Sequence, residues 1–96
     1  MTNQTSNFSF SVSPEATASL HHDGLVILHT GKGRVFRSNK SGALIWHGIE
    51  QRRSLDGLVE DISREFQIAG PTARAHTLNF LAALERQALI QREVAS

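Results

Sequence analysis

The chain contains no cysteine among its 96 residues, and it has only two prolines and one tryptophan. Without cysteine it can form no disulfide bond, no thiol nucleophile and no cysteine-ligated metal site. Its first residues, MTNQTSNFSFS, lack the basic start and the apolar run of a signal peptide. No segment approaches the roughly 20 apolar residues that a membrane span requires. We therefore expect a cytoplasmic protein that makes no contact with a membrane.

Charge is nearly balanced over the whole chain but is unevenly distributed along it. The formal net charge is +1, and the shares of 40% apolar and 20% charged residues are typical of a soluble globular domain. A stretch without acidic residues, here called the basic strip, comprises Lys32, Arg34, Arg37 and Lys40. This distribution argues against a protein that coats nucleic acid, and it permits recognition of an acidic peptide.

Three segments have the pattern of β-strands. Residues 8–12 alternate apolar side chains with serine and end before Pro14. Residues 25–29 form a compact apolar run. The turn-forming sequence Thr-Gly-Lys-Gly at 30–33 then separates this run from residues 34–38. We predict a hairpin between the second and third strands.

From residue 39 onward the apolar period becomes helical. Asn39, or alternatively Ser38, can cap the first helix through a side-chain oxygen, and Ser54 can cap the second. Pro71 suits the first turn of a third helix. Trp46 lies in the apolar run of the first helix, so we expect it to be buried between sheet and helices. A short extended tail is expected at residues 89–91.

The order of these elements predicts an α+β fold. It consists of a three-stranded antiparallel sheet followed by three helices, in a winged helix-turn-helix-like arrangement. We predict a single domain over residues 8–92 and disorder in residues 1–7, which are polar.

The sequence carries no arrangement of residues typical of catalysis or of metal binding. Five histidines are present, but no two are spaced four apart on a predicted helix. Neither the G-x-S-x-G pattern of a nucleophilic serine nor a glycine-rich phosphate-binding loop occurs. We expect a binding protein that is not an enzyme and that uses no metal ion and no cofactor.

Two binding functions fit this composition. The first is DNA binding, because a hairpin with three helices resembles a winged helix. The third predicted helix has only a few side chains that could contact DNA, namely Arg74, His76, Asn79 and Arg86. Nucleic acid is therefore the disfavoured ligand. The second function is peptide binding, in which a peptide adds as a strand beside residues 34–38. Cations on an edge strand also prevent aggregation through that edge, and an edge protected in this way could still bind one specific peptide strand.

A series of short motifs in order resembles the PqqD family, small peptide chaperones with the RiPP recognition element fold. The motifs are DG at 23–24, GKGRVF at 31–36, NKSGALIW at 39–46, SLDGLV at 54–59, FL at 80–81 with Leu84, and ALI at 88–90. The chain departs from the family pattern at Ser38, at His76-Thr77 and at Ala88, and it lacks a Pro-Glu-Arg element in the hairpin. The resemblance therefore implies a PqqD-like protein that serves a modified peptide other than the precursor of pyrroloquinoline quinone.

The resemblance implies a non-catalytic peptide chaperone. It would bind the leader of a ribosomally synthesised, post-translationally modified precursor peptide and present it to a maturation enzyme, either a radical SAM enzyme or a leader peptidase. The leader would add as a strand to residues 34–38, in a groove against the third helix. The residues implied in binding are Arg34, Val35, Phe36, Arg37, Ser38, Arg74, Leu78 and Leu81. Alternation along the strand places Phe36 on one face and Val35 and Arg37 on the other. An exposed strand edge could equally pair with a second copy in a homodimer.

Overall fold

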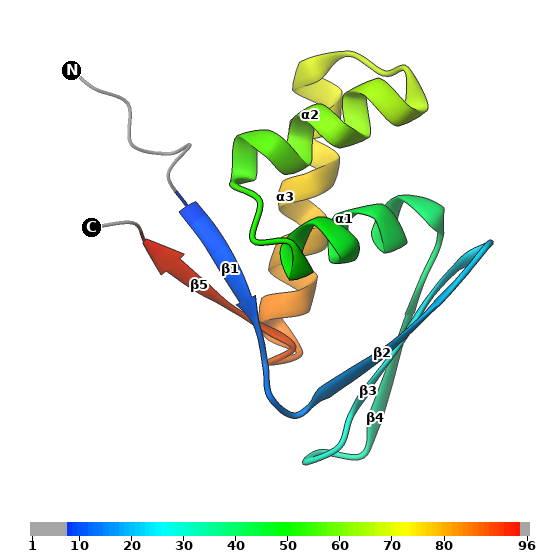
Figure 1. Cartoon of the computed structure of the whole chain (residues 1–96), viewed down its shortest axis with the longest axis vertical. Coiled ribbons are helices and arrows are strands. Elements are labelled where there is room, and N and C mark those ends of the chain that lie inside the picture. The colour runs from blue at the N-terminus through cyan, green and yellow to red at the C-terminus, as the bar shows by residue number, and fades with distance from the viewer. Residues whose placement is uncertain (1–7, 95–96) are drawn as a thin grey trace.

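The structure, a computed structural model, describes residues 8–94 and has an α+β fold. In chain order the elements are β1 (Phe8–Val12), β2 (Ala16–His21), β3 (Gly24–His29), β4 (Arg34–Ser38), α1 (Lys40–Glu50), α2 (Leu55–Phe66), α3 (Gly70–Arg86) and β5 (Ile90–Val94) (Figure 1). The predicted class, a three-stranded antiparallel sheet with three helices, is confirmed. In the described part of the chain, no helix combines the length and apolar character needed to cross a bilayer. The predicted disorder of residues 1–7 falls outside the described residues, and the single domain over 8–92 stays a prediction.

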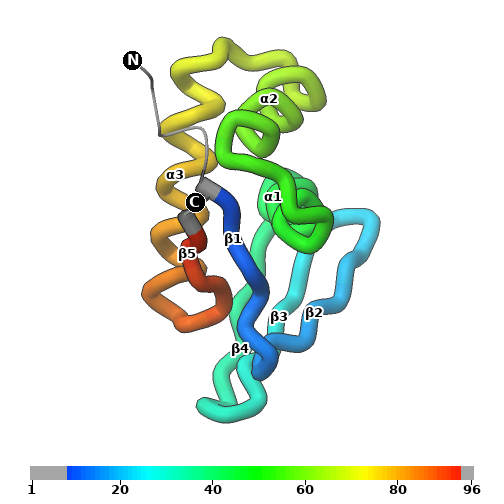
Figure 2. The backbone as a smooth tube through the Cα atoms, turned by 60° about the vertical axis from the view of Figure 1, so that its left-hand side comes forward, coloured from blue at the N-terminus to red at the C-terminus, as the bar shows by residue number. Residues whose placement is uncertain are grey.

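The strands form two sheets. β2, β3 and β4 make the three-stranded antiparallel sheet in that order, whereas β1 pairs with β5 in a separate two-stranded ribbon. Figure 2 follows the chain from β1, beside β5, round a corner into β2. The predicted place of residues 8–12 in the three-stranded sheet is therefore wrong, and β2 was not predicted. In β2, with the sequence ATASLH, small residues carry the alternation, so its apolar period is weak.

The first helix connects the two sheets. α1 lies in the angle between them (Figure 1) and packs against β1, β3 and β4. Its Trp46 is 0% exposed, as predicted, and the indole N–H donates to Glu50 Oε2 at 3.1 Å. The other large, fully buried side chains include Leu25, Ile27, Ile45, Ile49, Leu58, Ile62, Leu81, Leu84 and Leu89. Because this core draws on β3 and on all three helices, it fixes the sheet relative to α3.

The first two helices begin at the predicted capping residues. Asn39 Oδ1 accepts a hydrogen bond from the Gly42 N–H at 3.1 Å, and Ser54 Oγ accepts one from the Gly57 N–H at 3.2 Å. Pro71 lies in the first turn of α3, where its missing N–H is not needed. Since Asn39 directly follows β4, its cap ends that strand and begins α1.

All three helices end on a non-glycine residue in the left-handed conformation. Arg52, Gln67 and Ala88 have φ angles of 61°, 55° and 60°. In each case the following residue donates its N–H to the carbonyl five positions earlier, as Leu89 does to Leu84 at 3.0 Å. This is the Schellman pattern, whose left-handed residue is usually glycine. A side chain at that position costs roughly 1–2 kcal/mol.

Replacing Ala88 by glycine is expected to raise the free energy of unfolding by about 0.5–1 kcal/mol. Glycine relieves the left-handed backbone, although part of the gain is offset by its greater freedom in the unfolded chain. Urea denaturation followed by circular dichroism measures the change. Ala75→Gly is the matched control, because this exposed position lies inside α3. The control should lose about 0.5–1 kcal/mol. Equal losses in both variants would contradict the left-handed conformation of residue 88.

Candidate peptide-binding edge

β4 is an outer strand of the three-stranded sheet, and among the described strands it pairs only with β3. The turn before it follows the sequence prediction. Gly33 has a φ of 65°, which favours glycine, and His29 Nδ1 accepts a hydrogen bond from the Lys32 N–H at 3.2 Å. At the other end a side chain at Gly24 would collide with the Ser38 carbonyl oxygen. The turn at Gly33 and the close approach of Gly24 to Ser38 hold β4 along β3. The second edge of β4 remains open.

The backbone groups of Val35 and Arg37 are directed toward that open edge. Thr30 donates its N–H to the Glu15 carbonyl at 2.9 Å, on the β2 side of the sheet. Backbone groups alternate in direction along an antiparallel strand, so every second residue counted back from His29 faces β4. The β4 partners of these residues are Arg34, Phe36 and Ser38. The intervening residues Val35 and Arg37 therefore have outward N–H and C=O groups, which can receive another strand.

The third helix lies beside β4 and contacts it through side chains. Three pairs join α3 and the residue that follows it to β4 and to the start of α1, namely Phe36 with Phe80, Arg34 with Gln87, and Ser41 with His76. The phenylalanine ring centroids are 5.9 Å apart, and the two polar pairs are joined at 3.3 Å and 2.9 Å. His76, Phe80 and the cap residue Gln87 are spaced four and seven residues apart, which places them on one side of the helix and its end. The sequence analysis did not select these three residues for peptide binding, although this spacing is visible in the sequence.

The predicted α3 contacts lie on a different side of the helix. Arg74 Nη2 is 2.6 Å from Asp56 Oδ1 of α2, and Leu78 and Leu81 line a hollow that also includes Phe10 of β1. Leu81 is 2% exposed and belongs to the core. The structure therefore does not bring these three residues to β4. Helical periodicity identifies the buried stripe of α3, but it does not tell which flank of that stripe faces the sheet.

The five predicted residues of β4 all lie along the open edge. Arg34, Val35 and Arg37 are exposed, whereas Phe36 and Ser38 are half-buried. Phe36 lies opposite the buried Ile27 and faces the core, and Val35 is 54% exposed on the outer face. The predicted division of β4 into two faces is thus confirmed, while the binding role of these residues stays a prediction.

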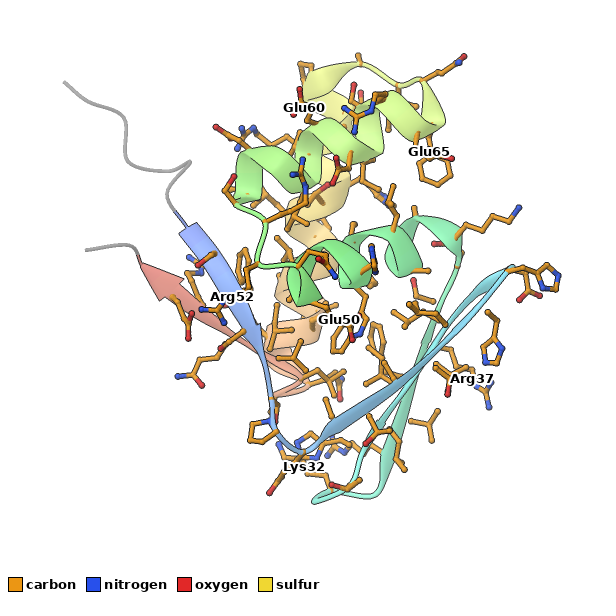
Figure 3. The ribbon with its side chains drawn as sticks, in the orientation of Figure 1. Lys32, Arg37, Glu50, Arg52, Glu60 and Glu65 are labelled. Carbon is orange, nitrogen blue, oxygen red and sulfur yellow. The ribbon has the colours of Figure 1, made fainter. Side chains whose placement is uncertain are left out.

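Positive charge beside this edge is not neutralised. Within residues 8–94, none of the four cations of the basic strip pairs with a carboxylate. The arginines that do form ion pairs are Arg52, Arg53, Arg64, Arg74 and Arg92. Figure 3 shows Lys32 at the tip of the β3–β4 hairpin and Arg37 on the side of the sheet away from the helices, with Glu60 and Glu65 on α2. The edge therefore suits an acidic ligand.

Beyond the end of β4 lies an apolar hollow of about 510 Å³. Ile62, Phe66 and Ile68 form its apolar lining, and Ser41 and His76 also border it. Phe66 is 38% exposed, because it lies at this hollow. In the described part of the chain, no group of three or more histidines and carboxylates could hold a metal ion.

Comparisons with known proteins identify the family of the chain and proteins that share its fold. The sequence model of the family described as coenzyme PQQ synthesis protein D (PqqD) matches residues 24–90, more than half of the chain. A solved structure described as TbiB1 in complex with the TbiA(beta) leader peptide has a TM-score of 0.80 and is 26% identical. That match covers 90% of this chain and 99% of the other. A structure of lasso peptide synthetase B1 complexed with the leader peptide has a TM-score of 0.78. It is 18% identical over 86% of this chain and 98% of the other, and it shows a shared fold. No curated protein sequence matches the chain.

Proposed function

The chain belongs to the PqqD family, as its motifs predicted, and we propose that it is a non-catalytic peptide chaperone. It binds the leader of a ribosomally synthesised, post-translationally modified precursor peptide as an added strand on β4. The observation that carries the proposal is the open edge of β4, with the outward backbone groups of Val35 and Arg37 beside α3. The described complexes of TbiB1 and lasso peptide synthetase B1 each hold a leader peptide, which supports the same role here.

Strand addition divides the recognition of the leader between backbone and side chains. Main-chain hydrogen bonds with β4 set the register, and alternate leader side chains enter the groove against α3. The four cations of the basic strip, which have no carboxylate partner among residues 8–94, favour an acidic leader. A leader that extends past Ser38 can place an apolar side chain in the hollow lined by Ile62, Phe66 and Ile68.

The chaperone itself performs no chemistry, and the bound leader is handed to a maturation enzyme. A radical SAM enzyme or a leader peptidase fits this role, because either acts on a peptide whose leader is held by another protein. We place the exchange in the cytoplasm, where a ribosomally made precursor first becomes available. A leader that orders only on binding loses conformational entropy, so an affinity in the micromolar range or somewhat tighter is expected.

DNA binding receives no support from the arrangement of α3. Its Arg74 is committed to Asp56 of α2 at 2.6 Å, and His76 contacts Ser41 of α1 at 2.9 Å. Arg74 lies on another side of the helix from His76, Asn79 and Arg86, so the exposed face of α3 offers DNA a single arginine, one histidine and one asparagine. A recognition helix needs more basic and amide side chains than these to contact base edges in the major groove.

Synthetic leader peptides are expected to bind in the micromolar range or tighter, and duplex DNA is expected not to bind near physiological salt. The peptides are taken from short reading frames that neighbour the gene, and isothermal titration calorimetry measures their affinity. A peptide of scrambled sequence and equal charge is the control for non-specific attraction to the basic strip. Size-exclusion chromatography of the free protein tests whether a second copy occupies the edge instead.

Two results would overturn the proposal. Sub-micromolar, sequence-dependent DNA binding in a mobility-shift titration would favour a winged-helix regulator. Equal affinity for the leader and its scrambled version would show that charge alone attracts the peptide, without the register that strand addition imposes.

A further inference from the structure

Strand pairing arranges the outer face of the three-stranded sheet in rows. The register places Thr17 of β2, Leu28 of β3 and Val35 of β4 in one row. Leu28 is 40% exposed and Val35 is 54% exposed, so this row ends at β4 in two adjacent apolar side chains open to solvent. A strand added to β4 would extend the row by one residue, and that residue would lie beside Val35.

The neighbouring row on the same face ends in a cation. Ser19 of β2, Val26 of β3 and Arg37 of β4 lie opposite one another. Arg37 is exposed and forms no ion pair within the described residues. A ligand residue that extends this row would lie beside the guanidinium group, where an acidic side chain is favoured and a basic one is repelled.

Between these rows, on the opposite face, lies Phe36. Its ring is half-buried and packs against Phe80 of α3 with centroids 5.9 Å apart. A ligand residue opposite Phe36 would lie on the face of the strand that carries Phe36 and its neighbour Phe80, so an apolar side chain is favoured there. Because the outward backbone groups belong to Val35 and Arg37, a slip by one residue would exchange the two faces and expose this apolar side chain.

From this register we propose that β4 selects three consecutive ligand residues by their side chains. It prefers an acidic residue beside Arg37, an apolar residue beside Phe36 and an apolar residue beside Val35. The proposal rests on the proposed function, since it needs a peptide strand on β4. A ligand antiparallel to β4 carries the three residues in this order from its N-terminus to its C-terminus, and a parallel ligand carries them in reverse order. Leader specificity is thus set partly on the outer face of the sheet, outside the groove.

Selection from a displayed library of random 12-residue peptides tests this pattern without knowledge of the natural leader. The wild-type protein is expected to enrich peptides with an acidic residue two positions from an apolar residue and another apolar residue between them. Arg37→Glu should enrich lysine or arginine at the acidic position and leave the other two positions unchanged. Arg64→Glu makes the same charge change on α2, where Arg64 is exposed, and should enrich the wild-type pattern.

A representative selected peptide provides the quantitative test. Its affinity should fall about three- to tenfold with Arg37→Glu at low salt, and a peptide with lysine at the acidic position should recover that affinity. The difference should shrink at high salt, because the pair is exposed to solvent. Val35→Arg should shift the preference beside residue 35 from apolar to acidic. Circular dichroism confirms that each variant is folded.

The outcomes separate this inference from the proposed function. If the selected peptides lose binding to Val35→Pro but show no fixed acidic position, the three-residue pattern is overturned and strand addition stands. The same holds if Arg37→Glu and the wild-type protein enrich one pattern. If the selected peptides bind Val35→Pro as well as they bind the wild-type protein, or if no peptide is recovered, the proposed function itself is overturned.

Discussion

Replacing Trp46 by alanine is expected to lower the free energy of unfolding by about 3–5 kcal/mol. The indole is 0% exposed, and its N–H donates to Glu50 Oε2 at 3.1 Å. Its loss leaves a cavity in the core beside α1. This helix packs against β1, β3 and α2 and joins the two sheets. A small domain has a total stability of only about 5–15 kcal/mol, so this variant should be close to unfolding.

Urea denaturation followed by circular dichroism measures this loss. Fluorescence cannot follow it, because Trp46 is the only tryptophan of the chain. Trp46→Phe retains part of the volume and should lose less. Leu78→Ala is the surface control, since Leu78 is 42% exposed, and it should lose roughly 1 kcal/mol. A loss below about 1 kcal/mol for Trp46→Ala would contradict the buried position and make Trp46 a candidate contact for the maturation enzyme.

Local patterns in the sequence were sufficient to predict the parts of the fold that are local in the chain. The β3–β4 hairpin depends on a four-residue turn, in which Gly33 has a φ of 65°. The starts of α1 and α2 depend on Asn39 and Ser54, whose side chains accept from backbone N–H groups three residues ahead. Each of these features needs only neighbouring residues, so short-range signals define it.

Pairing between distant segments was not predictable in the same way. β1 pairs with β5, and the partners Val12 and Ile90 are far apart in the sequence. No local pattern distinguishes that pairing from an alignment of residues 8–12 with the three-stranded sheet, since either buries the same apolar face of the strand. β2 escaped prediction for another reason. Its core-facing positions include Ala16 and Ala18, which give a weaker apolar alternation than valine or isoleucine would.

In the candidate site, too, the local features were predictable from the sequence and the packing between distant segments was not. Residues 34–38 were predicted as one strand with two faces, and the structure has that strand and those faces. At α3 the sequence analysis selected Arg74 and Leu78, whereas Phe80 of the helix and Gln87 at its C-terminal cap contact β4. Both pairs flank the same buried stripe. Only the packing of α3 against the sheet decides which flank faces the edge, and that packing depends on the whole core.

Ala88 is both a departure from the family pattern and a residue in the left-handed conformation. The resemblance to the PqqD family marks the departure, and the structure places this residue in a conformation that glycine adopts more easily. Residue 88 has a φ of 60° in the turn that connects α3 to β5. The turn after α3 must be tight because Ile90 begins β5, which closes the ribbon with β1. The strain at Ala88 therefore lies in the turn that brings β5 back to β1.

Proline at position 35 is expected to weaken leader binding by about 2–4 kcal/mol. Val35 directs its N–H toward the open edge, so proline removes a donor that an added strand would use and places its ring in the path of that strand. The loss exceeds that of an ordinary hydrogen bond, because the ligand carbonyl opposite residue 35 is left without a donor. Arg37 has the same backbone direction, and Arg37→Pro should have a similar effect.

The other edge of the same sheet supplies the matched control. Thr30 donates to the Glu15 carbonyl at 2.9 Å, and this bond sets the alternation of β2 as well. By that alternation Ala18, in the middle of β2, directs its N–H away from β3 and toward solvent. Ala18→Pro therefore makes an equivalent backbone change on the edge that faces away from α3. It should leave leader affinity unchanged.

Calorimetry with the same leader peptide compares the three proline variants, after circular dichroism has shown that each is folded. Loss of binding in Val35→Pro and Arg37→Pro but not in Ala18→Pro would place the leader on β4, because only the edge differs among the variants. If all three variants bind the peptide as tightly as the wild-type protein does, the peptide binds elsewhere. The basic strip would then serve only to keep an exposed edge from pairing with other chains. A loss with Ala18→Pro alone would place the leader on β2. The cations of the strip could then act on the leader only from across the sheet, and high salt should weaken binding much less.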